Sequence, residues 1–248
     1  MSAIYILWLR EIKRYIRSRA QILSSLAQPV LYLLALGFGF GSVFREAGRG
    51  SYLQFIAPGV IAMTVLFSSM FSGIALLWDR QFGFLKEVLV APQSRITIFV
   101  GRTLGTATVA MIHGSLVVIV TLLAGFRPTH VSTIPLAFVF MALIAIVFGA
   151  LGTAIGSVLQ DIQGFQLVMS FFVMPIFFLS GAIFPLTDLP QVLTVLTRAD
   201  GLSYGVDGLR GALIGNPVFG FSLDLTVLLV AAVVLLGIGS RLFSRIQL

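Results

Sequence analysis

Apolar residues fill six long stretches of this chain, and shorter polar segments separate them. The stretches cover residues 22–44, 55–77, 96–126, 134–159, 165–184 and 223–243. Each reaches the length of about 20 apolar residues that a helix needs to cross a bilayer. The pattern predicts an all-α polytopic membrane protein with six transmembrane helices, organised as one domain over residues 1–248.

Residues 1–21 precede the first predicted span and have the period of an amphipathic helix. One face holds the basic residues Arg10, Lys13, Arg14 and Arg17, and the opposite face holds Tyr5, Trp8, Leu9, Ile12 and Ile16. A basic stripe opposite an apolar stripe is typical of a helix that lies in the headgroup plane of a membrane. We therefore predict an interfacial helix that contacts membrane lipid through Trp8 and the four basic residues. The alternative is a basic leader that only fixes the topology.

The 16 Lys and Arg residues are unevenly distributed between the two sides of the predicted membrane. Six spans place both termini on one side, and most of the basic residues fall there, in residues 1–21 and 78–102. Basic residues are retained in cytoplasmic loops. We therefore predict a multi-pass protein of the cell (inner, cytoplasmic) membrane with both termini in the cytoplasm. The net charge of +7 is then a topology signal, and we expect no nucleic-acid partner.

Composition supports this class. The chain is 58% hydrophobic and 10% charged, whereas soluble domains are about 45–50% apolar and about 25% charged. The absence of cysteine excludes disulfides and thiolate metal sites.

Residues 78–102 form a charged, amphipathic segment between the second and third predicted spans. One helical face holds Phe82, Leu85 and Leu89, and the opposite face holds Arg80, Gly83, Lys86 and Glu87. Pro92 ends the predicted helix, and Arg95 leads into the next span. A short helix continuous with two spans can transmit a partner's movement into the membrane. We predict such a helix and loop over residues 79–95, with a topology-fixing loop that touches only headgroups as the alternative.

Residues 185–222 form a long connection between the fifth and sixth predicted spans. They contain a turn with Asp188 as a possible helix cap, a short apolar helix over 191–197, a break at Asp200-Gly201, and a second helix over 203–214. Two short, half-apolar helices predict a re-entrant hairpin on the outer side. Such backbone is tolerated at membrane depth only against protein or a water-filled cavity. A linker lying on the surface is the alternative.

Small residues recur at a spacing of four in several spans. The pairs are Gly37 and Gly41, Gly101 and Gly105, and Gly152 and Gly156. Such pairs allow helix backbones to approach closely in lipid, although glycine is also simply common in membrane helices. They predict tight packing without naming an interface.

Candidate catalytic groups are few. His113 lies inside the third predicted span, where a lone imidazole packed between helices is the commoner case and a functional ionisable group the alternative. Asp161 and Asp224 fall at span ends, where we expect them to be hydrated. No cluster of metal ligands occurs along the chain, and neither lysine follows a glycine, so the phosphate-binding Gly-Lys motif is absent. If transport is driven by ATP, the ATPase must be another chain.

Several segments resemble the permeases of type-2 ABC exporters, above all the branch of daunorubicin-type drug exporters and nodulation-factor exporters. The most specific segment is residues 79–95 with Gly101-Arg102 after it, and residues 179–185 and 202–210 support it. Gln81, Phe84 and Asp200-Gly201 depart from the wider family's pattern and fit a sub-branch. These departures weaken any inference about the substrate.

The resemblance implies a transport subunit that is not itself an enzyme. Residues 79–95 would be the coupling helix, seated in a separate ABC nucleotide-binding subunit that binds ATP and Mg. Two permease copies, as a homodimer, would pass an amphipathic drug, lipid or glycolipid between them, and drug export would give multidrug resistance. The outer hairpin would include Pro185, Tyr204, Asp207 and Arg210. No cofactor or metal is expected in this chain.

Two other functions stay open from the residues alone. An ion-coupled secondary transporter would work without ATP and would depend on His113. A non-transporting assembly subunit or an intramembrane enzyme subunit would associate with no ATPase.

Overall fold

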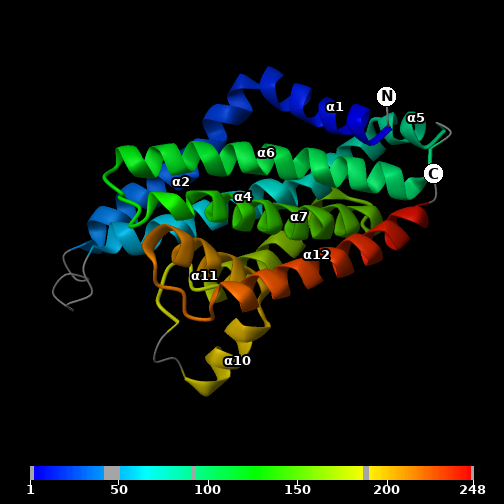
Figure 1. Cartoon of the computed structure of the whole chain (residues 1–248). Coiled ribbons are helices and arrows are strands. Elements are labelled where there is room, and N and C mark those ends of the chain that lie inside the picture. The colour runs from blue at the N-terminus through cyan, green and yellow to red at the C-terminus, as the bar shows by residue number, and fades with distance from the viewer. Residues whose placement is uncertain (1–2, 42–50, 91–92, 187–189, 247–248) are drawn as a thin grey trace.

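The computed structural model describes residues 3–41, 51–90, 93–186 and 190–246. Every regular element in these ranges is helical, which confirms the all-α prediction (Figure 1). The elements are α1 (Ala3–Arg17), α2 (Arg19–Gly39), α4 (Tyr52–Gln81), α5 (Phe84–Val90), α6 (Arg95–Leu123), η1 (Val131–Thr133), α7 (Ile134–Val158), α8 (Ile162–Val168), η2 (Met169–Val173), α9 (Met174–Leu179), α10 (Gln191–Ala199), α11 (Gly201–Ile214) and α12 (Phe221–Ser244).

Five helical segments of the described chain are long and apolar enough to cross a membrane. They are Tyr52–Gln81, Arg95–Leu123, Val131–Val158, Ile162–Leu179 and Phe221–Ser244, and they correspond to the second through sixth predicted spans. The apolar part of α2 is shorter and covers Ser25–Gly39. The end of the first predicted span, residues 42–44, lies outside the described residues. A sixth span therefore stays a prediction.

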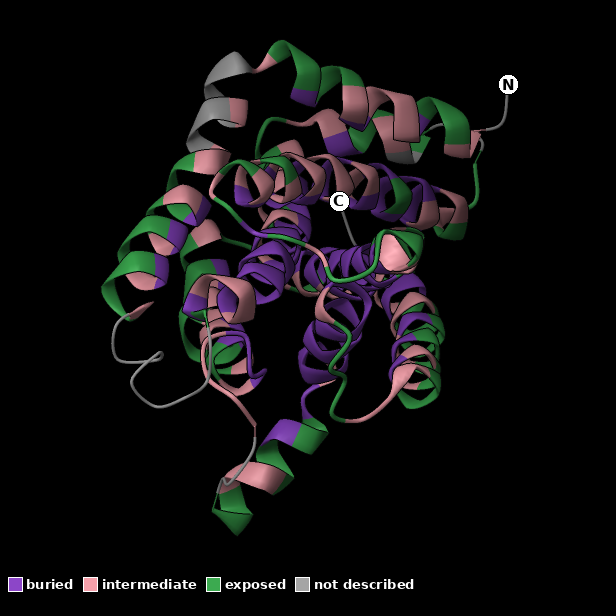
Figure 2. Ribbon diagram, turned by 60° about the vertical axis from the view of Figure 1, so that its left-hand side comes forward, coloured by how far each residue is buried: buried purple, intermediate pink, exposed green. Residues whose placement is uncertain are grey.

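The core of the bundle forms around α4 and α7. The α4 helix packs against α7, α6, α2 and α11, and α12 packs against α7, α11 and α6. Buried residues concentrate on the central helices (Figure 2), with Ile61 and Leu66 of α4 and Phe140 and Ile144 of α7 fully enclosed. By contrast, α10 projects from the body of the bundle (Figures 1 and 2).

Glycines set the closest helix approaches. A Cβ added at Gly156 of α7 would lie 2.7 Å from the carbonyl oxygen of Gly73 on α4, and one at Gly105 of α6 would lie 2.8 Å from the Cβ of Glu11 on α1. In lipid, where apolar side chains gain little from leaving one solvent for another, close backbone packing holds helices together. The predicted pairs at residues 101/105 and 152/156 thus mark real interfaces. In the third pair, a Cβ at Gly37 would lie 3.2 Å from the Leu53 side chain of α4, whereas one at Gly41 would meet nothing within 4 Å.

The α1 helix runs lengthwise along the first half of α6, in the same direction (Figure 1). Leu7 lies beside Gly101, and Tyr15 contacts the His113 ring three turns further along. The α1 helix therefore docks onto α6 through the buried residues Leu7, Glu11 and Tyr15 and leaves Tyr5 and Ile16 of the predicted apolar face exposed. A position in the headgroup plane stays a prediction.

The fifth predicted span is not one continuous α-helix. The π-helical turn η2 separates α8 from α9, and Pro175 follows in the first turn of α9. Proline lacks the N–H that would continue the helical hydrogen bonds, and π turns occur mostly as single interruptions of α-helices. The turn leaves Phe171 80% exposed, while Phe177 packs its ring against Phe67.

The connection between the fifth and sixth spans contains the two predicted short helices, α10 and α11. Asp200 ends the first and caps the second, because its carboxylate accepts a hydrogen bond from the N–H of Leu202 at 2.8 Å. The proposed cap Asp188 lies outside the described residues, and α10 starts after Pro190 without a side-chain cap. Nearly all of α11 is buried. Whether the pair re-enters the membrane stays a prediction.

Replacing Gly156 with Ala should lower the melting temperature of the detergent-solubilised protein. The new Cβ would approach three backbone atoms of Gly73, which can move only if α4 and α7 separate, and overpacking of this kind costs about 1–3 kcal/mol. The matched control is Gly237→Ala on α12, where a Cβ meets nothing within 4 Å and alanine favours the helix. Equal melting temperatures for the two variants would contradict the close approach of α4 and α7.

Candidate functional site

Five charged side chains from three helices meet at the end of the bundle that carries α5. We call them the charge cluster: Arg10, Glu11 and Arg14 of α1, Asp79 of α4, and Arg102 of α6. Arg102 and Arg10 both donate to the Oδ2 atom of Asp79, the latter at 3.2 Å. Glu11 accepts from Arg10 at 2.7 Å and pairs with Arg14 at 2.6 Å. Two carboxylates thus hold three guanidinium groups.

The two carboxylates and Arg102 are largely shielded from solvent, whereas the side chains of Arg10 and Arg14 are 25% and 46% exposed. Side-chain exposure is 3% for Glu11, 4% for Arg102 and 14% for Asp79. Buried charges are stable only when they are paired and hydrogen-bonded, so each member depends on the others. Burial alone would lower the pKa of the Arg10 guanidinium, but Glu11 and Asp79 together raise that pKa above its ordinary value.

Arg10 also connects the cluster to α5. Its guanidinium carbon lies 4.4 Å from the centre of the Phe84 ring, the first residue of α5. A guanidinium over an aromatic face at this distance is an attractive cation–π contact. The cluster therefore joins α1, α4, α5 and α6 at one point.

The α5 helix is shorter than the predicted helix because Gly83 breaks it. Gly83 has a φ of +79°, a conformation that favours glycine, and it separates the end of α4 from α5. Leu85 is 1% exposed and packs into a small apolar cluster with Ile98 of α6. Phe82 lies in the turn and is 83% exposed, so its predicted position on the Leu85 face is wrong.

The outward surface of this end is mixed in character. We call it the α5 surface: the exposed residues Phe82, Lys86, Glu87 and Val90. It combines two large apolar groups with one charge of each sign. Pro92, the predicted helix stop, lies outside the described residues.

Two other predicted residues of this segment lie on the helices next to α5 and not on α5 itself. Arg80, in the last turn of α4, donates to the carbonyl oxygen of Leu159 at 3.3 Å. Arg95, the first residue of α6, donates to the carbonyl oxygen of Ile246 at 2.7 Å. They tie the α4 and α6 ends to the α7–α8 connection and to the end of the chain.

The remaining predicted residues of α1 have two different roles. Trp8 donates from its indole N–H to the hydroxyl of Thr108 on α6 at 2.9 Å, so it anchors α1 to protein. Lys13 and Arg17 are exposed and stay candidates for contact with lipid headgroups. His113 is buried and lies 2.6 Å from the hydroxyl of Ser68, which is the packed imidazole that the sequence favours.

At the opposite end, the predicted residues of the outer hairpin are mostly buried anchors. The Asp207 carboxylate accepts from the backbone N–H groups of Val218 and Phe219, at 2.8 and 2.7 Å. Arg210 donates to the carbonyl oxygen of Gly181 at 2.8 Å and lies over the Phe55 ring. Burial lowers the pKa of the Arg210 guanidinium to about 10, an effect that Asp207 partly opposes. Tyr204 donates to the carbonyl oxygen of Arg198 at 2.8 Å.

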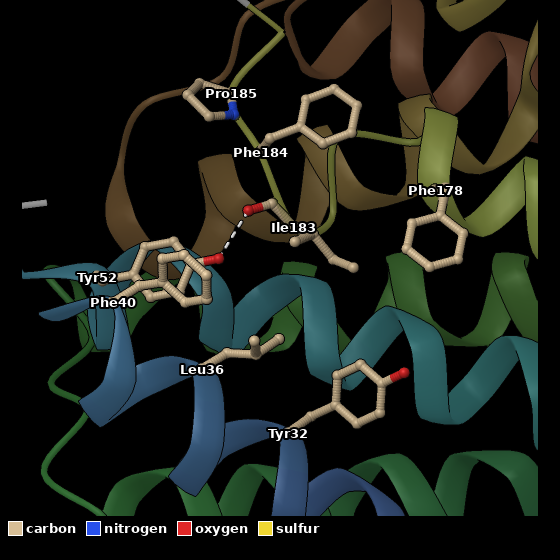
Figure 3. Close-up of a pocket in the computed structure, with 8 residues that line it drawn as sticks. All are labelled: Tyr32, Leu36, Phe40, Tyr52, Phe178, Ile183, Phe184 and Pro185. Atoms are coloured by element: carbon tan, nitrogen blue, oxygen red, sulfur yellow. Dashed lines mark hydrogen bonds between the residues drawn. The ribbon is translucent and has the colours of Figure 1, made fainter. Parts of the chain in front are cut away.

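Pro185 lines an apolar groove beside this hairpin (Figure 3). The groove has a volume of about 450 Å³ and is lined by Tyr32, Leu36, Phe40, Tyr52, Phe178, Ile183, Phe184 and Pro185. The Tyr52 hydroxyl donates to the carbonyl oxygen of Ile183 at 2.9 Å and fixes one wall. The size falls within the range of small-molecule sites, and the lining suits an apolar group.

The expectation that acids at span ends are hydrated holds for one of the two. Asp161 is exposed and caps α8 through the N–H of Gly164. Asp224 is fully buried in the first turn of α12, because that turn packs against α11. Asp200 is also buried, and burial raises the pKa of its carboxyl to about 7 although Leu202 and Ser203 hydrogen-bond to it.

Sequence reasoning missed three members of the charge cluster: Glu11, Asp79 and Arg102. A signal was present for Glu11, the one acid within a basic helix and three residues before Arg14. Asp79 and Arg102 were assigned to a hydrated segment because they flank α5 in sequence. Their burial results from α4 and α6 continuing as packed helices past the apolar stretches.

The described residues contain no group of three or more side chains suited to hold a metal ion. The arrangement at the α5 end is suited to transmitting force between helices, and the groove is suited to holding an apolar group.

Comparisons with known proteins show what this chain is similar to. The family model described as ABC-2 type transporter matches residues 2–214, a range that includes the charge cluster, α5 and α11. Nodulation protein J of Rhizobium leguminosarum bv. viciae is 28% identical over 228 residues, which cover 91% of this chain and 87% of that protein. Nodulation protein J of Rhizobium leguminosarum bv. trifolii is 30% identical over 201 residues, covering 80% and 76%. A putative transport permease, ycf38 of Cyanophora paradoxa, is 27% identical over 198 residues, covering 76% and 66%.

Replacing Asp79 with Asn should destabilise the protein by on the order of 3 kcal/mol, because it leaves Arg102 buried without its counter-charge. The measurement is the melting temperature in detergent. Adding Arg102→Gln to this variant should recover part of the loss, since the unpaired charge is then gone. Asp161→Asn, at an exposed cap, is the control and should melt as the wild type does. A wild-type melting temperature for Asp79→Asn would show that the cluster does not hold the helices.

Replacing Asp200 with Asn should remove a pH dependence of stability. The Asp200 carboxyl has a pKa of about 7 in the folded protein against an ordinary 3.8, so its contribution is fully present below about pH 4 and is lost as pH rises to about 7. Asn also caps helices and cannot ionise. Melting temperatures measured from pH 4 to 8 should fall more steeply for the wild type than for the variant. Parallel curves would contradict the assignment.

Proposed function

The chain belongs to the ABC-2 type transporter family, and from this premise we propose that it is the membrane permease subunit of an ATP-driven exporter. Its single transmembrane domain would move an amphipathic drug, lipid or glycolipid outward. The relatives whose names describe a function are transport permeases, which supports transport. The choice of cargo rests on the apolar groove and on the resemblance to drug and nodulation-factor exporters.

The energy source would be a separate nucleotide-binding subunit. The chain has no Gly-Lys sequence, and a phosphate-binding loop requires one. ATP and Mg would therefore bind to the partner, and this chain would supply no cofactor site. The complex would hydrolyse ATP, while the permease would only respond to it.

The observation that carries the proposal is the α5 surface. Phe82 and Val90 are more than 80% exposed, although large apolar groups are costly to leave in water. Aromatic side chains with a few charges around them are typical of the centre of a protein–protein interface. The charge cluster behind this surface connects it to three long helices, so a partner that moves α5 would move them too.

A second copy of the chain would complete the transport path. The exposed aromatic residues of the fifth span, including Phe171 and Phe172, lie on the same helix as Phe178 of the groove. Two copies facing each other through this helix would enclose an apolar route for the cargo. The charge bias of the loops supports cytoplasmic termini in the cell membrane, which places the α5 surface where an ATPase can reach it.

Charge reversal at Glu87 tests the proposal. Glu87→Arg should weaken the association with the ATPase subunit about tenfold or more, because a matched charge at an interface becomes a repulsive one. The readouts are co-purification from detergent and cargo-stimulated ATP hydrolysis in liposomes. The matched control is Arg127→Glu, an exposed charge reversal of equal size at the other end of the bundle.

Both readouts should be normal for the control. Unchanged association and hydrolysis in Glu87→Arg would refute the α5 surface as the contact. Transport driven by an ion gradient without ATP would refute the exporter itself and favour a secondary transporter.

A further inference from the structure

Asp224 is a buried carboxylate that nothing in the transport mechanism uses. It lies in the first turn of α12 with 0% of its surface exposed. Within the described part of the chain, neither of its carboxylate oxygens has a hydrogen-bond partner. An ionised carboxylate enclosed without donors is among the most unfavourable groups in a folded protein, so something must neutralise it.

No cation of the surrounding helices reaches Asp224. The α7 helix has no ionisable residue. The basic groups of α6 are engaged elsewhere: Arg95 with Ile246, Arg102 with Asp79, and His113 with Ser68. Neutralisation must therefore come from α11 or from a bound species.

The charged groups of α11 do not supply it either. Arg210 donates to the carbonyl oxygen of Gly181 and stacks over Phe55. Asp207 is close enough to repel a negative charge on Asp224, and its own oxygens accept from the N–H groups of Val218 and Phe219. Tyr204 donates to Arg198. The nearest charge thus makes an ionised Asp224 still less favourable.

We propose that Asp224 is a proton-binding site and that the closed protein holds it as a neutral carboxylic acid. The bound species is a proton and not a metal ion, because a metal cation requires several oxygen ligands and the Asp207 oxygens are occupied by N–H donors. Binding is a single step in which the carboxylate and one proton form the acid. No other reactant takes part.

The position of the site links the proton to a movement. Asp207 holds residues 218 and 219 at the entrance to α12, and Asp224 lies just inside that entrance. Separation of α11 from the start of α12 would admit water, in which an aspartic acid ionises with a pKa of about 3.9. Opening therefore releases one proton and closing takes one up. The opening equilibrium should increase about tenfold for each pH unit above 4 until the closed state also loses its proton.

The first test detects the bound proton directly and does not depend on the proposed transport function. The full chain with Asp200→Asn is placed in lipid nanodiscs, and this substitution removes the buried Asp200 carboxyl, whose pKa is about 7. Infrared spectra at neutral pH should contain the C=O band of a protonated carboxylic acid that lacks a strong hydrogen bond. Adding Asp224→Asn should remove this band, and adding Asp161→Asn, at an exposed carboxylate, should leave it unchanged.

The second test follows the movement. Hydrogen exchange of residues 215–224, corrected for the intrinsic effect of pH, should increase with pH in the Asp200→Asn protein and be independent of pH after Asp224→Asn. Absence of the carboxylic acid band in the Asp200→Asn protein would overturn the proposal, whether or not the double variant folds. Exchange that responds to sodium concentration and not to pH would also overturn it, in favour of a cation site.

Discussion

The contact on which the α5 end depends is the buried pair of Asp79 and Arg102. It fixes the end of α4 to α6, two turns inside the latter helix, and it supplies the negative charge onto which Arg10 and Arg14 dock. Without Asp79, the three guanidinium groups of Arg10, Arg14 and Arg102 would have only the carboxylate of Glu11 near them. Removing one partner of a buried ion pair leaves an uncompensated buried charge and is strongly destabilising. This end of the bundle therefore behaves as one unit.

A unit of this kind explains how a short helix could move long ones. Leu85 packs α5 onto the start of α6, and Arg10 holds Phe84 to α1 and α4. The flexible element is Gly83, whose positive φ allows α5 to leave the line of α4. The side-chain contacts of Leu85 and Phe84 would therefore transmit a displacement of α5 to the long helices. The backbone connection from α4 to α5 is only a turn. Force would pass through the cluster.

The sequence predicts the long helices well because length and apolar composition decide them. The α6, α7 and α12 helices begin and end within three residues of the predicted ranges, as does the shorter α11. The predictions fail where contacts with other parts of the structure determine the position of a side chain. Phe82 matched the helical period, but Gly83 ended the helix. The contact of α1 with α6 was not predicted, and it uses Leu7 and Glu11 beside the glycines of α6. The hydrophobic period of a short helix shows that the helix has two faces. It does not show which face packs against the neighbouring helices.

The acids near span ends show the same limit of sequence-based prediction, here for charged groups. Asp79 and Asp224 both occupy the terminal turn of a long apolar helix, a position where the sequence suggests contact with water. The structure encloses Asp224 completely and leaves Asp79 14% exposed, but three guanidinium groups surround Asp79 and a second carboxylate lies near Asp224. Paired, a buried acid joins helices at any ordinary pH; unpaired, it needs a proton, and its helix contact then depends on the proton supply. The neighbouring helices thus determine whether an acid forms ion pairs that hold helices together or becomes a binding site.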